Sequence, residues 1–412
     1  MTQIVKAIAF FLPQFHPTPE NDQWWGKGFT EWRNVTRAEP QFPGHYQPHL
    51  PADLGFYDLR LPEVRAAQAA MAREYGITGF CYYHYWFNGR RILERPFNEI
   101  LASSEPDFPF CLCWANENWS RAWDGGTRNL LLEQHYSDED DVAHIHSLLP
   151  ALRDPRYIRI DGRPLLLIYR TELLPDPART AATWRRVARE SGLGEIYLAR
   201  VENFVAGVDP GSIGFDAAIE FSPDNREVGQ PVYSGAITKT LSRCGILPRA
   251  YARHTVLRYP VIAESRMKRP IPPYKRFRCV TPMWDNVARR KAGGRILVGS
   301  TPARYRRWLE MAARQTLERF TGDERIVFIN AWNEWAEGCH LEPDQKHGHA
   351  YLEATRDALA AAAKNTSQPS RAAPERAASP KRTALRDIYW AVRRRFDELG
   401  QITRSILRIP PS

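Results

Sequence analysis

Two glutamates three residues apart, Glu334 and Glu337, lie in the segment Ala331 to Asp344, which reads AWNEWAEGCHLEPD and places a tryptophan beside each of them. Cleavage of a glycosidic bond needs one acid and one base, and an aromatic wall can stack on a sugar ring. Residues three apart on a strand point to opposite faces, so both carboxyls can serve one site only if the strand ends near Glu334 and the backbone curls, as Gly338 permits. By itself such a short motif is also compatible with a polar loop.

Eight short apolar or β-rich runs punctuate the chain, and helical periodicity follows most of them. They span Lys6 to Pro13, Ile77 to Tyr85, Phe108 to Ala115, Pro164 to Tyr169, Glu195 to Val201, Phe215 to Phe221, Phe277 to Met283 and Arg325 to Asn330. Such runs alternating with helices are typical of parallel strands covered on both faces, and eight of them predict an α/β fold of the (β/α)8 TIM-barrel type. A doubly wound open sheet is the main alternative, but no GxGxxG motif follows the first run.

Five helices are predicted from apolar residues at helical spacing and from their end signals. They span Leu61 to Tyr75, Asp141 to Leu152, Arg179 to Ser191, Pro302 to Phe320 and His349 to Ala363. The fifth unit is the weakest, because residues 202–214 leave little room for a helix.

The predicted domain organisation is a catalytic barrel over residues 1–363, a flexible linker over 364–381 and a basic amphipathic helix over 382–409. A long basic insertion, about residues 223–275, separates the sixth and seventh strands. The terminal helix is expected to lie on an anionic membrane surface or to pack on a protein surface.

Basic charge is concentrated in two segments. Residues 243–295 hold 14 Lys and Arg against two acidic residues, and residues 364–412 hold 11 against four, whereas the whole chain carries +10. This distribution is expected if the segments meet phosphate-bearing partners, and equally if they are simply solvated.

Polar and aromatic residues recur at the carboxyl ends of the predicted strands, where a barrel of this type has its active site. The candidate substrate-binding residues are Gln14, His16, Trp32, Tyr83, His84, Trp86, Asn116, Glu117, Trp119, Glu202, Glu220, Trp284, Asp285, Asn333 and Trp335, with Glu334 and Glu337 as the candidate catalytic pair. Together they predict a polar, aromatic-lined cup suited to hydroxyl-rich ligands.

No cofactor and no metal ion are expected. His340, Glu342 and Asp344 lack a recognised metal-ligand spacing, and no nucleic-acid-binding module accompanies the basic segments. The six cysteines form no CxxC pair and four lie in or beside apolar runs, so reduced core thiols and a cytoplasmic location are expected. The short apolar start has no cleavage signal, and peripheral attachment at the inner face of the cytoplasmic membrane would depend on the terminal helix.

The strings FFLPQFHP, GKGFTEW, GFCYYHYWFNG, CWANENW and NAWNEWAEG together resemble the WbsX-like proteins of lipopolysaccharide O-antigen and other surface-polysaccharide gene sets, a group related to glycoside hydrolase family 99. The resemblance covers roughly residues 5 to 360. Family 99 enzymes are retaining endo-α-mannosidases or mannanases with a (β/α)8 barrel and two glutamates in an NEWxEG-like motif.

By that resemblance Glu334 would be the base that deprotonates the sugar 2-hydroxyl, so that this oxygen attacks the anomeric carbon. Glu337 would be the acid that protonates the departing oxygen and later activates water or an acceptor. The resemblance implies no covalent enzyme nucleophile, and it does not fix the sugar.

Three functions are therefore open. The first is a glycosidase-like enzyme that cleaves or transfers glycosyl units of an oligosaccharide or lipid-linked glycan in bacterial surface polysaccharide biosynthesis. The second is a glycosyltransferase whose nucleotide- or lipid-phosphate-linked donor binds the basic insertion. The third is a catalytically silent glycan-binding scaffold.

Overall fold

The computed structural model describes residues 5–120, 130–224, 231–233 and 235–364. The predicted linker beyond Lys364 and the predicted amphipathic helix 382–409 lie outside these ranges, as do a few residues of the insertion. None of the described helices is both long enough and apolar enough to span a membrane.

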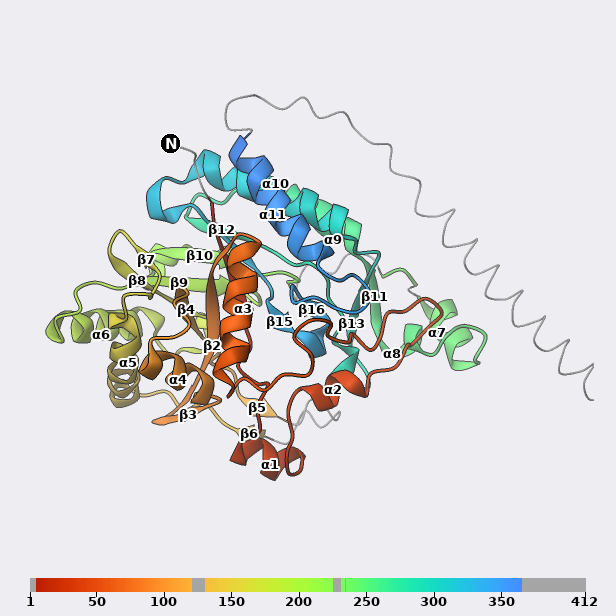
Figure 1. The fold of residues 1–412 in the computed structure, drawn as a ribbon, viewed down its shortest axis with the longest axis horizontal. Helices are drawn as coiled ribbons and strands as arrows, with labels where there is room; N and C mark the ends of the chain where they lie inside the picture. The colour runs from red at the N-terminus through yellow and green to blue at the C-terminus, as the bar shows by residue number, and fades with distance from the viewer. Residues whose placement is uncertain (1–4, 121–129, 225–230, 234, 365–412) are drawn as a thin grey trace, which may run out of the picture.

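Eight parallel strands form a closed barrel at the centre of the molecule (Figure 1). They are β1 (Lys6–Phe11), β2 (Ile77–Phe87), β4 (Phe110–Trp114), β8 (Arg163–Ile168), β9 (Tyr197–Glu202), β10 (Ala217–Glu220), β12 (Arg276–Val280) and β14 (Ile326–Ile329). The order is β1-β14-β12-β10-β9-β8-β4-β2, and β1 also pairs with β2, which closes the sheet. The prediction of a TIM-type (β/α)8 barrel is confirmed.

Side chains alternate between the barrel interior and its outer surface. The ring of Phe10 packs against Tyr83, Phe221 and Phe328 across the interior, with each centroid separation 5.6 Å. The next residue on β1, Phe11, instead packs against Tyr82 on the outer surface. Neighbours at the end of a strand therefore point to opposite sides of the sheet, which decides which of the predicted site residues can meet.

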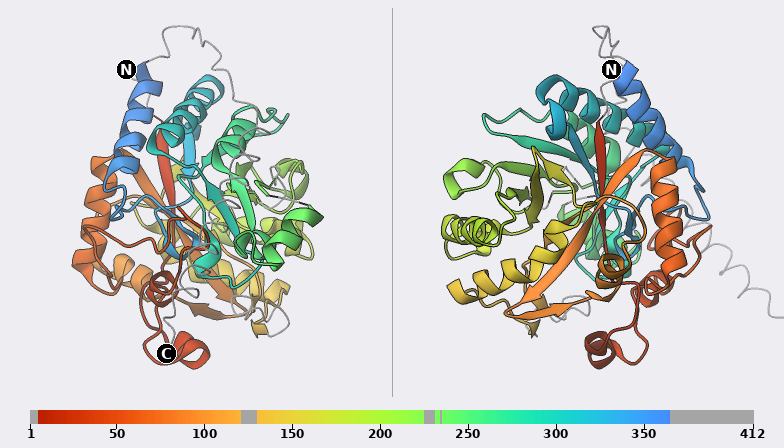
Figure 2. Two further views of the ribbon diagram at one scale, coloured as in Figure 1. Left: turned by 90° about the vertical axis from the view of Figure 1, so that its right-hand side faces the viewer. Right: turned by 60° about the vertical axis from the view of Figure 1, so that its left-hand side comes forward.

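Helices cover the outside of the barrel (Figure 2). They are α3 (Pro62–Glu74), α4 (Arg95–Ser103), α5 (Asp138–Arg153), α6 (Pro177–Glu190), α10 (Pro302–Arg319) and α11 (Ala350–Lys364). Side-chain oxygens of Ser137, Asp176 and Thr301 cap the first turns of α5, α6 and α10. The five predicted helices are present; α4 was not predicted because residues 95–103 are a short stretch that begins with Arg-Pro.

Shorter elements occupy the loops. They are α1 (Pro19–Trp25), α2 (Trp32–Thr36), β3 (Arg90–Ile92), β5 (Trp119–Ser120), β6 (Leu130–Leu132), β7 (Arg159–Ile160), β13 (Arg295–Val298), β15 (Asn333–Glu334) and β16 (Cys339–His340). The insertion between the sixth and seventh barrel strands contains α7 (Ala236–Arg243), α8 (Ala250–Arg253), β11 (Thr255–Arg258) and α9 (Tyr259–Met267). Strand β11 pairs with β13, which joins the insertion to the loop that follows β12.

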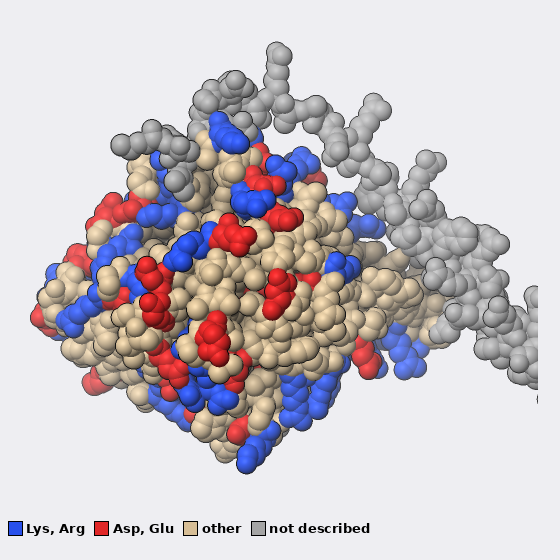
Figure 3. Space-filling model, viewed as in Figure 1, with Lys and Arg blue, Asp and Glu red and all other residues tan. Residues whose placement is uncertain are grey.

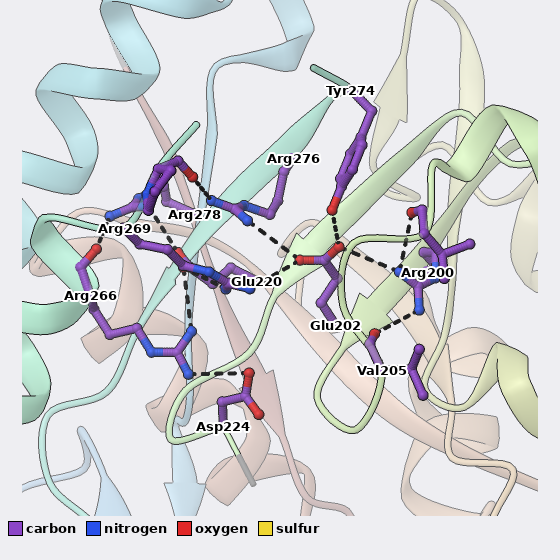
Figure 4. A network of polar contacts seen from close by, with 12 residues as sticks. Arg200, Glu202, Val205, Glu220, Asp224, Arg266, Arg269, Tyr274, Arg276 and Arg278 are labelled. Carbon is purple, nitrogen blue, oxygen red and sulfur yellow. Dashed lines mark hydrogen bonds and ion pairs between the residues drawn. The ribbon is translucent and has the colours of Figure 1, made fainter. Parts of the chain in front are cut away.

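The connection from β9 to β10 contains one 3-10 turn, Pro210–Ile213, and no α-helix. The sequence predicted this, because residues 202–214 leave little room for a helix. Figure 4 shows what covers this side of the barrel: a network of arginines around Glu202 and Glu220. Glu220 lies 3.0 Å from Arg269 and 3.4 Å from Arg278, while Glu202 accepts a 2.6 Å hydrogen bond from Tyr274. Both glutamates are fully buried.

This network changes the interpretation of the basic insertion. The side chain of Arg266 is 1% exposed and that of Arg269 is 11% exposed, and both contact Glu220. Part of the basic charge therefore neutralises buried carboxylates inside the protein instead of facing a partner. On the surface seen in Figure 3, Lys and Arg are interspersed with Asp and Glu.

Replacing Glu220 by Gln is expected to destabilise the fold by about 3–5 kcal/mol, because the buried guanidinium groups lose their counter-charge. The matched control is Glu264→Gln, which breaks an exposed pair with Lys268 and should cost less than about 1 kcal/mol. Urea unfolding followed by circular dichroism measures both values, and equal effects would contradict a structural role for Glu220.

The same network predicts an acid sensitivity. Burial alone would raise the pKa of Glu220, but the surrounding arginines lower it from 4.5 to about 2. A depressed pKa means that the contribution of Glu220 to stability is present above about pH 4.5 and is lost as the pH falls towards 2. The unfolding free energy of the Glu220→Gln variant should lack this part of the pH dependence.

Candidate active site

The two candidate catalytic glutamates lie on a hairpin that follows the last barrel strand. Strand β14 ends at Ile329, and β15 then pairs antiparallel with β16, so that Glu334 stands opposite Cys339. One 3-10 turn, Trp335–Glu337, connects the two short strands and contains the predicted curl. The backbone therefore leaves the barrel strand before Glu334 and brings both carboxyl groups to one side.

Asn333 fixes this hairpin to the end of β1. Its side-chain oxygen accepts from the backbone N–H of Leu12 at 2.7 Å, and its side-chain nitrogen donates to the Leu12 carbonyl at 3.0 Å. Both polar atoms are used within the protein, so Asn333 positions the hairpin and is not arranged as a substrate ligand.

Arg289 lies between three carboxylates. Its Nη2 is 2.9 Å from Glu334 Oε2, its Nη1 is 2.9 Å from Glu337 Oε1, and its Nε is 3.0 Å from Glu31 Oε1. Glu31 comes from the long loop after β1, whereas Arg289 directly follows the short turn Asn286–Ala288 beyond β12. One guanidinium thus joins loops that follow the first, seventh and eighth strands.

Burial of this cluster favours protonated carboxyl groups. Burial raises the pKa of Glu334 from 4.5 to about 8; Arg289 opposes the shift, and the negative charges of Glu337 and Glu31 add to it. Burial also raises the pKa of Glu337, against the effect of Arg289. Arg289 would face three negative charges if all three carboxyl groups were ionised, with Arg290 acting on Glu337 as well, so burial and repulsion favour a proton on Glu334.

A cavity of about 310 Å³ opens beside the two glutamates at the carboxyl ends of the barrel strands. Its lining combines aromatic rings with polar groups. The lining residues are Leu12, Gln14, Trp25, Tyr83, Tyr85, Ala115, Glu117, Asn118, Trp119, Ser120, Leu131, Tyr169, Phe221, Arg289, Arg290, Glu334 and Glu337. Rings with scattered hydrogen-bonding groups suit the alternating apolar and hydroxylated faces of a sugar.

Six of the seventeen predicted residues line this cavity: Gln14, Tyr83, Glu117, Trp119, Glu334 and Glu337. Gln14 is buried, and within the described residues its Nε2 has no hydrogen-bond partner, so it offers a donor to a ligand. Glu117 is held by Arg170, at 2.5 Å from Nη1 to Oε1.

Eleven predicted residues do not line the cavity. They are His16, Trp32, His84, Trp86, Asn116, Glu202, Glu220, Trp284, Asp285, Asn333 and Trp335. Several are on the wrong face of a strand: Glu220 precedes the cavity residue Phe221 and points outward to the arginine network, as does Glu202. His84 contacts His144 of α5 in the same way, at 2.9 Å between their Nε2 atoms, and Trp86 donates to Asp140.

Other predicted residues hold loops together. Trp335 is 1% exposed, donates to Glu342 at 2.6 Å and stacks on His340, so it is not a platform for a sugar. Trp32 donates to the Tyr57 carbonyl. The side-chain amide of Asn116 donates to the Arg170 carbonyl and accepts from the Arg170 backbone N–H.

Three predicted residues remain: His16, Trp284 and Asp285. His16 is buried, and burial lowers the pKa of its imidazole to about 4. Trp284 and Asp285 line a separate cavity of about 130 Å³, and the Asp285 carboxylate is held by His45 and Gln47. The backbone N–H of Asp285 donates to the Glu337 carbonyl at 2.6 Å, so Asp285 supports the turn that carries Glu337.

Sequence reasoning did not select Arg289, Arg290, Tyr85, Tyr169 and Phe221, although they line the cavity. Side chains alternate along a strand, so Tyr83 and Tyr85 lie together on the cavity side. This alternation is the signal that could have identified Tyr85. Arg289 was one of 14 basic residues in residues 243–295; its position just after the seventh strand is the signal that could have singled it out.

The sequence matches a known protein family over most of its length. Residues 7–355 match the family described as Glycosyltransferase WbsX, and the chain belongs to that family. Two proteins called Uncharacterized protein WxcX, from two strains of Xanthomonas campestris pv. campestris, are 48% identical to this chain over 361 residues. The match covers 85% of this chain and 49% of each relative, so the chain spans about half the length of these relatives.

Solved structures share the fold at low sequence identity. A glycoside hydrolase-like protein superposes with a TM-score of 0.52 at 14% identity, covering 87% of this chain and 94% of its own. A GH99 endo-alpha-mannosidase from Bacteroides thetaiotaomicron superposes with a TM-score of 0.51 at 14% identity, covering 88% and 98%. At this identity the likeness shows the barrel architecture.

Replacing Gly338 by Ala should disturb the turn Trp335–Glu337, which ends at this glycine. Gly338 has a φ of 52°, and an added Cβ would lie 2.9 Å from both Cβ and the carbonyl oxygen of Asp285. Gly348 has a φ of 53° with open space around it, so Gly348→Ala measures the cost of the left-handed backbone alone, about 1 kcal/mol. Gly338→Ala should cost about 1–3 kcal/mol more, measured by urea unfolding. The same loss in both variants would show that the contact with Asp285 is unimportant.

Proposed function

We propose that this chain is a glycosidase-like enzyme that cleaves or transfers glycosyl units of a bacterial surface polysaccharide or its lipid-linked precursor, with Glu334 and Glu337 as the catalytic pair. The observation that carries the proposal is the position of both carboxyl groups on one guanidinium at the wall of an aromatic, polar cavity. The family match and the relation of its fold to a GH99 endo-alpha-mannosidase support the same chemistry.

In the first step Glu334, in its ionised form, removes the proton of the sugar 2-hydroxyl, and that oxygen attacks the anomeric carbon. The bond to the leaving oxygen breaks with its electron pair, and Glu337 protonates that oxygen. In the second step ionised Glu337 takes a proton from water or from an acceptor hydroxyl, whose oxygen opens the three-membered ring at the anomeric carbon. Glu334 returns its proton to the 2-oxygen, so both glutamates are regenerated.

The raised pKa of Glu334 bears on its role as base. A carboxylate with a pKa of about 8 is a stronger base than an ordinary glutamate and is better matched to a weakly acidic hydroxyl. The raised pKa also means that the ionised form of Glu334 is the minor form at pH 7. Arg289 is the group that stabilises this ionised form.

Transfer to a sugar acceptor is the variant of this function that the family description favours. It uses the same two glutamates, with an acceptor hydroxyl in place of water. A donor phosphate on Arg266 and Arg269 loses support, because both guanidinium groups contact buried carboxylates. The cations at the cavity itself are Arg289 and Arg290.

Product analysis by mass spectrometry on free and lipid-linked glycans, with water alone or with an added acceptor, separates hydrolysis from transfer. Glu334→Gln and Glu337→Gln should each lower turnover by about 10²- to 10⁴-fold, the usual loss of a general acid or base. Glu63→Gln at an exposed position is the matched control and should keep wild-type turnover. Wild-type turnover in both site variants, with intact folding, would contradict the proposal. Saturable glycan binding by the wild type without any turnover would favour a binding scaffold.

A dinitrophenyl glycoside of the sugar so identified then separates the two roles, because its leaving group needs no protonation. It should restore the first step in Glu337→Gln and leave Glu334→Gln inactive. Restoration in Glu334→Gln instead would reverse the assignment of acid and base.

A further inference from the structure

A second cluster of buried polar side chains lies behind the catalytic hairpin. Among the described residues, His49, His340 and Asp344 form a group whose nearest ligand atoms lie within 4.8 Å of one another. The three side chains are 4%, 2% and 2% exposed. Residue 49 is almost 300 positions away from the other two, so the sequence around His340 gave no sign of a third ligand.

The three donor atoms lie close together. His49 Nδ1 lies 2.9 Å from His340 Nε2, and His340 Nε2 lies 3.8 Å from Asp344 Oδ2. Tetrahedral zinc with bonds of 2.0–2.2 Å places its ligand atoms about 3.3 Å apart, and the two distances lie on either side of that value. Two imidazoles and one carboxylate are ligands that zinc commonly takes, with water or a further oxygen in the fourth position.

The surroundings leave the donor atoms oriented for an ion. His340 Nδ1 lies 2.9 Å from the Glu342 carbonyl oxygen, the contact that fixes the tautomer of a metal-binding histidine with the lone pair on Nε2. Asp344 Oδ1 accepts backbone N–H groups of Lys346 and His347 in a turn. Asp344 Oδ2 is buried and, within the described residues, has no hydrogen-bond partner.

A hydrogen bond between the two imidazoles would not satisfy this carboxylate oxygen. The hydroxyl of Tyr46 lies beside Asp344 and interacts with its carboxylate, but within the described residues neither the hydroxyl nor Asp344 Oδ2 has a hydrogen-bond partner of ordinary length and angle. An unpaired buried carboxylate oxygen is costly, whereas a divalent cation would satisfy all three donors at once. Tyr46 or water would then complete the coordination.

We propose that His49, His340 and Asp344 bind one zinc ion, which fastens the loop after β1 to the hairpin that carries Glu334 and Glu337. His340 lies opposite Asn333 in that hairpin, and its ring stacks on Trp335 at 3.8 Å. The ion is structural: it lies behind the hairpin, because neither His340 nor Asp344 lines the glycan cavity.

The site lies beside a cavity, and its loop contacts the residue that supports the turn carrying Glu337. The cavity of about 130 Å³ is lined by Tyr46, His49 and His347, so an ion can approach His49 from outside. The same loop supplies His45 and Gln47 to Asp285, which donates to the Glu337 carbonyl. Zinc at His49 would therefore hold the segment that supports the catalytic turn.

The test uses the full chain, dialysed against metal-free buffer and then titrated with zinc, with metal content measured by mass spectrometry and thermal unfolding followed in zinc and in chelator. The wild type should bind about one zinc per chain and unfold at a higher temperature with zinc. Cobalt substitution should give the visible absorption of a tetrahedral site.

Asp344→Asn and His340→Gln should each weaken zinc binding by more than about 100-fold. This exceeds the loss expected when the removed residue only orients a metal ligand. His146→Gln, which removes an exposed histidine, is the matched control and should bind zinc as the wild type does. If His340→Gln fails to fold, Asp344→Asn decides, because it preserves the shape of the side chain. A wild type without saturable zinc binding, or Asp344→Asn that binds zinc as tightly, would overturn the proposal.

Discussion

The placement of Arg289 among Glu31, Glu334 and Glu337 is the interaction on which the candidate site depends. One guanidinium faces three carboxylates here, so burial and mutual repulsion favour a cluster that retains a proton. This constraint raises the basicity of Glu334, and the proposed reaction starts from the form in which Glu334 is ionised and Glu337 holds the proton. Burial alone would lower the pKa of Arg289, but the three carboxylates raise it well above its ordinary value, so Arg289 stays charged.

The barrel explains why groups so far apart in the chain meet. Loops after the first, seventh and eighth strands bring Glu31, Arg289 and the glutamate pair to the carboxyl end of the barrel, where Asn333 and Asp285 hold the hairpin in place. The arginine network around Glu202 and Glu220 has a different role, because it covers the side of the barrel where the fifth unit lacks a helix. Charge in this protein is thus used both for chemistry and for closing the fold.

The sequence predicted the architecture well because apolar runs and helix-end signals are local. All eight barrel strands match their predicted ranges to within three residues at each end, and the curl between Glu334 and Glu337 follows from their spacing and Gly338. The lining of the site was predicted less well, because the side of the sheet on which a strand-end residue points depends on where the strand stops. His84 and Glu220 were predicted to line the cavity, whereas their neighbours Tyr85 and Phe221, which were not selected, are lining residues. Contacts between distant segments, such as Arg289 with Glu31 and His49 with His340, leave no local pattern.

The most direct test of the central claim is a carbon-13 NMR titration of the full chain labelled at the glutamate carboxyl carbons, with Glu334→Gln used to assign the Glu334 resonance. The account predicts a midpoint near pH 8 for Glu334, because burial beside two other carboxylates disfavours its ionised form. A midpoint near its ordinary value of 4.5 would contradict the account, since Glu334 would then be ionised at neutral pH and would have no raised basicity.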